Sequence, residues 1–377
     1  MQGVRVHVTG SAALDCEGDL LRSAHKFVRS FVQEAIARGA GLVLGAGSEP
    51  YGDSGEPCIF DWTALEEIAA ASDPAPGWPA LRPERFVVAA SQRALTQVPQ
   101  RRTDIWAKCC KRTDFDLSVS PAGWRMGGII RERQVLRGDV LLVVGGGAGA
   151  EHLAELYRDE AKPVIPIHVD LGAIGHDGSG GSRYLHDQAL ASPGTFFRLR
   201  EGSGSAAARL SALRLTPGTE GEALAKEVAN LLANLLPSRA FYVRLLATEH
   251  AEFPAVERFF RAVVDDVVKG RGFAPYEMGR GSPEAAFMNV EVFKGLHRAA
   301  LVVVDLTGVR PNCTVELGYA LGRRRRVVIS ARAGTELPFD YDKLPIYIWD
   351  DNGSPNEQIS AYRNWLDRNI DLPPLVE

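Results

Sequence analysis

Apolar residues follow two different spacings along this chain. Short runs rich in Val, Ile and Leu are separated by longer segments in which apolar residues recur every three or four positions. The short runs are typical of strands buried on both faces, and the longer segments are typical of amphipathic helices. Their alternation predicts βα units that build parallel sheets. The first series of predicted strands comprises Val4–Val8, Gly41–Leu44, Phe86–Ala89, Val140–Val144 and Val164–Ile167, with Phe196–Leu199 at an edge.

A second series of the same kind occupies the C-terminal part of the chain. Its predicted strands are Tyr242–Leu246, Phe273–Pro275, Leu301–Asp305, Val327–Ser330 and Ile346–Trp349. Its predicted helices are Ala255–Lys269, Glu284–Arg298, Val315–Leu321 and Asn356–Arg368. The predicted fold class is therefore α/β, with two Rossmann-like domains that are each built on an open parallel sheet.

Small and flexible residues separate the two series. Residues 201–208 are Gly, Ser and Ala after one Glu, and a Pro217-Gly218 turn follows them. The segment Glu220–Leu235 has leucines at helical spacing, which predicts a connecting helix. The predicted organisation is a first domain over 1–200, a linker and connecting helix over 201–238, and a second domain over 239–377.

Composition excludes several classes of protein. The 377 residues include 43 Lys+Arg against 47 Asp+Glu, and this balance argues against nucleic acid as the main partner. No apolar run is long enough for a membrane span, and the start has no signal-peptide pattern, so a cytoplasmic location without membrane contact is expected. The five cysteines form no C-x-x-C pair and the eight histidines no known ligand spacing, so no metal site is expected.

Glycine-rich turns follow three predicted strands of the first domain. In a parallel sheet the carboxyl ends of the strands lie at one edge, where glycine lets backbone amides approach a phosphate. The sequence predicts a phosphate-bearing ligand there, although glycine after a strand also serves as a simple tight turn. The candidate ligand-binding residues in these turns are Gly10, Ser11, Ala12, Gly45, Gly47, Gly145, Gly146 and Gly147.

These turns, together with Arg131, the run 139–147 and the run 162–167, resemble a SLOG domain over about residues 1–200. The hydrolytic branch of that superfamily carries Pro-Gly-Gly-x-Gly-Thr-x-x-Glu, whereas this chain has Gly145-Gly146-Gly147-Ala148-Gly149-Ala150-Glu151. The resemblance therefore implies the branch that senses nucleotide signals, with a cyclic nucleotide or a cyclic ADP-ribose type of molecule as ligand. Arg131 or Arg133 would hold its phosphate; the alternative is a solvated start of a helix.

The most informative motif of the second domain runs from Leu301 to Gly322. A buried strand ends at Asp305, the loop Leu306-Thr307-Gly308 follows, and a helix is expected to carry Glu316 in its first turn. The run from Asp305 through Asn312 to Glu316 and Ala320 resembles the group of TIR-like and nucleoside 2-deoxyribosyltransferase-like domains, over about residues 240–350.

This resemblance implies cleavage of an N-glycosidic bond with Glu316 as the central carboxylate. A carboxylate stabilises the oxocarbenium character at the anomeric carbon or forms a covalent intermediate with it. Asp305 and Asn312 would hold the ribose hydroxyls, and Thr248, Glu249, Thr307 and Gly308 would line the substrate pocket. The alternatives are that Glu316 only complements the helix dipole, that Asp305 caps the strand end, and that Asn312 caps the helix.

Together the two resemblances imply an antiphage effector. A nucleotide-derived signal binds the first domain and activates N-glycosidic cleavage by the second, with NAD as substrate and no cofactor. A homo-oligomer is expected on activation, because TIR-like domains commonly complete their sites by self-association. The alternatives are a nucleoside or nucleotide N-glycosidase, a 2-deoxyribosyltransferase, and a non-catalytic scaffold that binds nucleotides.

Overall fold

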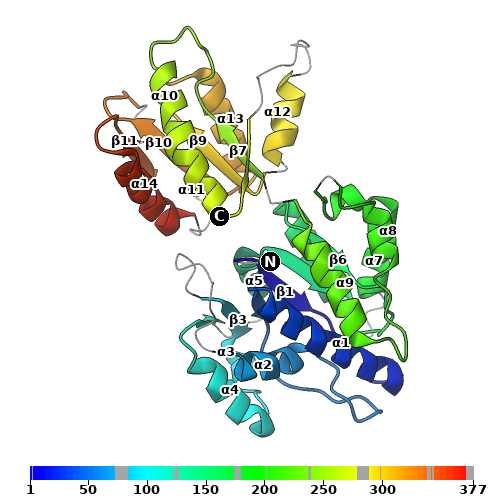
Figure 1. Cartoon of the computed structure of the whole chain (residues 1–377). Coiled ribbons are helices and arrows are strands. Elements are labelled where there is room, and N and C mark those ends of the chain that lie inside the picture. The colour runs from blue at the N-terminus through cyan, green and yellow to red at the C-terminus, as the bar shows by residue number, and fades with distance from the viewer. Residues whose placement is uncertain are drawn as a thin grey trace. The chain divides into compact units, whose positions relative to one another are not determined.

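The computed structural model shows two compact units, Met1–Leu236 and Pro237–Glu377 (Figure 1). It describes residues 1, 3–72, 84–121, 123, 127–173, 180–200, 202–236, 239–277, 288–297, 299–337, 341 and 344–370, and within 288–291 the backbone alone. Both units have the predicted α/β class, and each contains one all-parallel sheet.

The first unit contains a six-stranded sheet in the order β4-β3-β2-β1-β5-β6. All five predicted internal strands agree with it to within two residues at each end, and Gly41–Leu44 agrees at both ends. The prediction missed β4, and it was wrong about Phe196–Leu199, where Leu199 forms only an isolated bridge with Leu235. The strands are β1 Arg5–Thr9, β2 Gly41–Leu44, β3 Phe86–Ser91, β4 Phe115–Ser120, β5 Val140–Val143 and β6 Val164–Pro166.

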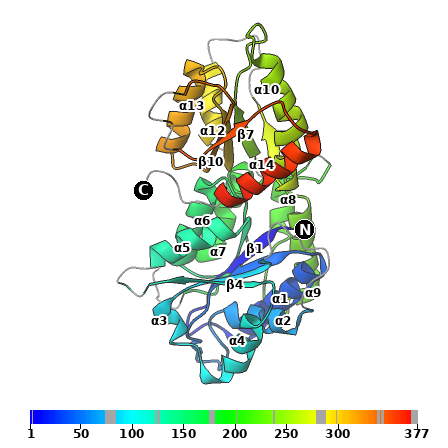
Figure 2. The ribbon, with the colours of Figure 1, turned by 90° about the vertical axis from the view of Figure 1, so that its left-hand side faces the viewer.

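Helices cover both faces of this sheet. Helices α1, α2 and α9 lie on one face and α5 and α6 on the other (Figure 2). One buried cluster fills the unit, with Phe27, Phe31 and Leu42 among its fully buried members. The helices are α1 Gly18–Ala37, α2 Asp61–Ala70, α3 Gln92–Leu95, α4 Thr103–Cys110, α5 Gly127–Arg137, α6 Ala148–Asp159, α7 Gly181–Ala191, α8 Ala206–Ser211 and α9 Gly221–Ala233, with short 3-10 turns at Gln100–Arg102 and Pro193–Thr195.

The range predicted as linker and connecting helix lies almost entirely within the first unit. Helix α8 occupies residues 206–211, and α9 packs along α1. The buried side chains of α9 include Leu224, Val228 and Leu231. Glu201 and residues 237–238, at the two ends of the predicted range, lie outside the described residues.

The second unit contains a five-stranded sheet in the order β11-β10-β9-β7-β8. The prediction for Leu301–Asp305 and Ile346–Trp349 is confirmed at both ends, whereas the strand predicted over Tyr242–Leu246 starts and ends three residues earlier. The strands are β7 Arg239–Val243, β8 Ala274–Tyr276, β9 Leu301–Asp305, β10 Val327–Arg332 and β11 Ile346–Trp349. The helices are α10 Phe253–Phe259, α11 Asp265–Gly270, α12 Met288–His297, α13 Pro311–Gly322 and α14 Pro355–Asn369, with a π-helical turn at Phe260–Val264 between α10 and α11.

Side chains of the central strands point alternately to the two faces of the sheet and pack into two hydrophobic cores. Tyr242 and Val303 pack against the face that carries α10, α11 and α14. Val243 and Val304 pack against the opposite face, with α12 and α13. This period of two is what a strand buried on both faces requires. None of the described helices is long and apolar enough to cross a membrane.

The strand order gives each sheet a point where the direction of winding reverses. In the first unit this switch point lies between β1 and β5, and in the second it lies between β7 and β9. Ligands of open α/β sheets bind beyond the carboxyl ends of the strands at such points. The loops after these four strands are therefore the candidate ligand-binding sites of the two units.

Candidate functional site

Glu316 lies in the second turn of α13, one turn later than predicted. The helix starts at Pro311 after Arg310, which is extended and acts as the N-cap, so Glu316 is the sixth helical residue. The predicted start at Val315 was too late because proline at the first helical position was not counted as part of the helix. The helix-dipole explanation for Glu316 weakens accordingly, since that effect is confined to the first turn. Asn312 is the second helical residue and is exposed, so the alternative explanation of it as the helix cap was wrong, while its expected contact with a ribose hydroxyl stays a prediction.

The carboxyl of Glu316 is partly buried and has no hydrogen-bond or ion-pair partner among the described residues. Burial raises its pKa from 4.5 to about 7. The preceding turn of the same face carries Cys313, which is buried, and burial is also the main cause that raises the pKa of that thiol to about 12. A half-buried carboxyl that no structural partner holds is available for chemistry.

Asp305 is fully buried at the end of β9 and takes part in a local network. Its Oδ2 accepts hydrogen bonds from Ser330 Oγ at 2.8 Å and from Trp349 Nε1 at 2.8 Å. Its Oδ1 accepts one from the Thr307 amide at 3.1 Å. Burial raises its pKa, and these hydrogen bonds oppose that rise. Both oxygens thus tie β9 to β10, β11 and the loop that follows, which supports the strand-end cap rather than contact with a ribose.

The loops after β7 and β9 meet at the switch point. A Cβ atom at Gly308, whose φ is +76°, would lie 3.0 Å from His250 Cε1, so a side chain at that position would be strained and would press on the ring. Thr307 is buried, and its Oγ1 accepts a hydrogen bond from the Arg332 amide at 2.9 Å. Thr307 and Gly308 therefore shape the loop, and Gly308 keeps it close to the neighbouring one.

Two predicted pocket residues are exposed on the loop after β7. Thr248 and Glu249 both face solvent, and Thr248 Oγ1 lies 3.5 Å from a Glu249 carboxylate oxygen. Sequence reasoning missed their neighbour His250, which lies against Gly308. It also missed Arg332 at the end of β10, which forms an ion pair with Glu252 at 2.6 Å. Only the strand order places these residues at one edge.

Three glycines in the turns after β1 and β5 have positive φ values. Gly10, Gly145 and Gly146 have φ values of +147°, +68° and +81°. A Cβ at Gly10 would lie 1.8 Å from the Val144 carbonyl oxygen, so the turns after β1 and β5 approach each other too closely for any side chain. Glycine is required here for packing of the two loops themselves.

Four of the eight candidate ligand-binding residues donate their backbone amides within the protein. The amide of Ala12 donates to Cys58 O, that of Gly146 to Ser11 O, and that of Gly145 to Ser182 Oγ at 2.7 Å. In the turn after β2, the Gly45 amide donates to Asp61 Oδ1 at 2.7 Å and the Gly47 carbonyl accepts from Trp62 Nε1 at 3.1 Å. These residues build the turns rather than presenting free donors.

Free amides lie in the turn after β1 and at the start of α6. Within the described residues, the amides of Ser11, Gly147 and Gly149 have no acceptor. The Arg131 guanidinium lies beside this helix start: its Nη2 is 2.9 Å from where a Cβ at Gly149 would be, and its Nη1 is 3.3 Å from His152 Nδ1. A guanidinium and free amides at a helix start suit a phosphate. Arg133 differs, because its Nη1 donates to the Val119 carbonyl at 2.8 Å.

Three acidic side chains near the glycine turns form hydrogen bonds or ion pairs. Glu49 has no exposed side-chain surface and pairs with Arg101 at 2.8 Å and Arg102 at 2.6 Å. Asp61 accepts from the Gly45 amide, and Glu151 Oε1 accepts from the Gly181 amide at 2.9 Å. Of these described acids, none has the uncommitted character of Glu316.

Comparison with known proteins shows the family to which the first unit belongs. The family described as "ATP nucleosidase Cap17-like, N-terminal" matches residues 1–232. Two curated proteins named ATP nucleosidase Cap17, one from Escherichia coli strain KTE188 and one from Escherichia coli, are 26% identical to this chain over 196 residues. That match covers 51% of this chain and 37% of each relative, so the chain spans little more than a third of their length.

One solved structure, the CMP N-glycosidase BcmB of Clostridium botulinum, aligns with 34% of this chain and 100% of its own at 12% identity. The TM-score of 0.26 is too low to establish a shared fold. The match to the nucleosidase family, by contrast, covers more than half of the chain and ends four residues before the boundary between the units. The chain belongs, through residues 1–232, to the ATP nucleosidase Cap17-like family defined by its N-terminal domain.

Proposed function

We propose that this chain is an N-glycosidase of antiphage defence whose second unit cleaves the N-glycosidic bond of a nucleotide with Glu316. The observation that carries the proposal is the uncommitted Glu316 carboxyl, half-buried beside the β7/β9 switch point and with a pKa raised to about 7. The relatives matched by the first unit are named ATP nucleosidases, which supports this class of reaction.

The second unit is the better candidate for the chemistry. Glu49, Asp61 and Glu151, near the glycine turns of the first unit, are held by arginines or by backbone amides, whereas Glu316 has no partner among the described residues. Arg131 and free amides instead lie at the start of α6, an arrangement that suits binding of an anion without cleavage. We propose that a nucleotide-derived signal binds there and favours the active state of the second unit.

NAD is the substrate that suits a lone carboxylate. Cleavage breaks the bond between the anomeric carbon and the ring nitrogen of nicotinamide, and the electron pair goes to that nitrogen and neutralises the pyridinium. Water then adds to the anomeric carbon and loses one proton, which gives nicotinamide, ADP-ribose and a proton. Because nicotinamide leaves as a neutral molecule, no acid has to protonate it. An ionised Glu316 stabilises the positive charge that develops on the sugar.

ATP or another purine nucleotide is the second candidate substrate, because the relatives are named for ATP. A purine leaving group usually needs a proton. Glu316 is half protonated near pH 7, so it has a proton to give in part of the molecules. Transfer of the sugar to another base, as in a 2-deoxyribosyltransferase, uses the same carboxylate with a base in place of water.

The deciding experiment is base release, measured by chromatography with the full chain. NAD, ATP and deoxynucleosides are each incubated with and without a panel of cyclic nucleotides and cyclic ADP-ribose isomers, for wild type and Glu316→Gln. Release of nicotinamide by the wild type alone, in the presence of one signal, supports the whole proposal. Release of adenine changes the substrate and keeps the mechanism.

Base release that persists in Glu316→Gln would contradict the role of Glu316 and move the chemistry to the first unit. A wild type that binds the signal without releasing any base would support the scaffold alternative. Light scattering of the same samples tests the expected assembly: the mass should increase by a whole-number factor with the activating signal and remain constant with the inactive ones.

A further inference from the structure

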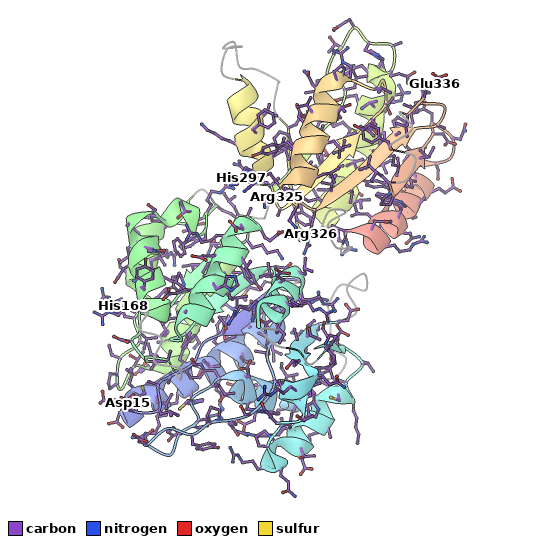
Figure 3. All side chains as sticks on the ribbon, turned by 180° about the vertical axis from the view of Figure 1, so that it is seen from behind. Asp15, His168, His297, Arg325, Arg326 and Glu336 are labelled. Atoms are coloured by element: carbon purple, nitrogen blue, oxygen red, sulfur yellow. The ribbon has the colours of Figure 1, made fainter. Side chains whose placement is uncertain are left out.

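A second cluster of polar side chains lies in the first unit, away from the Gly145–Gly149 turn. It consists of His168, just after β6, and His186 and Asp187 on α7. One potential ligand atom from each of the three lies within 4.8 Å of the other two. His168 is labelled in Figure 3, and the elements involved, β6, α7 and α8, are neighbours.

His186 is fully buried and has one nitrogen without a partner. Its Nε2 lies 2.9 Å from the Leu210 carbonyl oxygen, and because a carbonyl only accepts, Nε2 carries the hydrogen. Nδ1 is then a bare lone pair, and among the described residues none donates a hydrogen bond to it. The Asp187 carboxylate, 4.0 Å from Nδ1, faces the same space. Leaving a buried acceptor unpaired is unfavourable unless something else uses it.

We propose that His168, His186 and Asp187 bind one divalent transition-metal ion. Two imidazoles and one carboxylate suit Zn²⁺, with water as the fourth ligand on the exposed side of Asp187. The hydrogen bond from His186 Nε2 to Leu210 O is the outer contact that metal-bound histidines usually make, and it orients Nδ1 as the ligand.

The geometry requires only small side-chain movements. Ligand atoms around a tetrahedral zinc ion lie about 3.3 Å apart, given metal–nitrogen distances of about 2.0–2.1 Å. His168 is half-buried and Asp187 exposed, so both have room to rotate toward the fixed His186. The charge of Arg214 also acts on His186, but that side chain is exposed, and the Asp187 carboxylate opposes its effect.

The ion would position the glycine turn of the first unit. Helix α7 begins with Gly181 and Ser182, which support that turn: Ser182 Oγ accepts from the Gly145 amide, and a Cβ at Gly181 would lie 1.8 Å from Gly146 O. A metal joining His168 to α7 therefore fixes the helix that supports the turn after β5. These three are positioning residues, not catalytic ones.

The test uses the untagged full chain, first stripped with a chelator and then titrated with zinc. We expect about one equivalent to remain after gel filtration, as measured by elemental analysis, together with a higher Tm. Cobalt(II) should give the visible absorption of a tetrahedral site. Zinc should also slow amide hydrogen exchange in α7 and the turn at 145–147, which weak binding elsewhere on the surface would not do.

Two conservative variants distinguish a loss of zinc binding from a loss of folding. His168→Gln and Asp187→Asn alter side chains that are not fully buried and should each weaken zinc binding at least about tenfold, while Asp104→Asn, an exposed acid on α4, should not change it. Zinc retained equally by both variants, or no stoichiometric zinc in the wild type, overturns the proposal.

Discussion

The Trp349 indole donates a 2.8 Å hydrogen bond to the Asp305 carboxylate. This contact gives Asp305 a structural role that Glu316, the other acid of the motif, does not have. Asp305 joins three strands and is fully buried, whereas Glu316 has no described partner and is only partly buried. In the motif that both acids share, one therefore maintains the shape of the sheet edge and the other remains available to a substrate.

Trp349→Phe should destabilise the second unit without abolishing its fold. The substitution keeps an aromatic ring stacked on Phe259, whose centroid lies 4.4 Å away, but removes one donor to the buried Asp305. A buried acceptor that loses a donor costs about 1–3 kcal/mol. Urea unfolding measures the loss. Trp365→Phe is the control, because its indole makes ring contacts with Tyr347 and Tyr362 but none with Asp305. Equal losses in both variants would show that the Asp305 contact has no special weight.

Glu316→Gln should lose base release by at least about a thousandfold, because the carboxylate acts directly on the reacting sugar. Chromatography of the released base measures the effect. The matched control is Glu336→Gln, an exposed acid of the same unit that is labelled in Figure 3. A similar loss in the control would point to damage of the whole unit instead.

The same variant should be more stable than the wild type at pH 8. The folded state raises the pKa of Glu316 from 4.5 to about 7, so the folded chain favours the neutral carboxyl. Its contribution is neutral below pH 4.5 and becomes destabilising as the pH rises to 7. Glutamine removes this cost, which after allowance for partial exposure is about 1–2 kcal/mol. Urea unfolding at pH 5 and pH 8 should show a clearly larger gain at pH 8.

The pH profile of the reaction should report the ionisation of Glu316. If the carboxylate stabilises the sugar cation, kcat/KM rises with pH and levels off above about 7, the pKa in the free protein. The cationic nicotinamide ring of bound NAD favours the ionised form of Glu316, so the midpoint of kcat should lie at lower pH. A rate that falls through pH 7 would instead identify Glu316 as the proton donor and favour a purine leaving group.

Arg131→Ala should weaken binding of the phosphate-bearing signal about ten- to a hundredfold, because a guanidinium at a helix start is a strong anion partner. Calorimetric titration with the activating signal gives the Kd, and the loss should shrink at high salt. Arg133→Ala is the matched control, since that guanidinium donates to the Val119 carbonyl. If both variants bind alike, Arg131 is not part of the site.

Much of the fold follows from local pattern. Leu301–Asp305 and Gly41–Leu44 are continuous apolar runs, and such runs form strands whichever neighbours they pair with. Strand β4 was missed although Phe115, Leu117 and Val119 alternate with polar residues, because a half-buried edge strand gives a weaker signal than a buried run. Helix α8 was missed because its alanines lie in a stretch dominated by Gly and Ser.

The sequence by itself determined the α/β class, the carboxyl-end loops and the residue types in them, because hydrophobic spacing and glycine turns act over a few neighbouring residues. Only the tertiary structure decided which charged groups are free. Arg131 and Arg133 are two positions apart, yet one lies beside a helix start and the other bonds to a neighbouring strand. His168 and His186 are eighteen positions apart and meet only through the packing of α7. Burial and hydrogen bonding depend on distant segments, and these decide whether a carboxylate, a guanidinium or an imidazole is available for function.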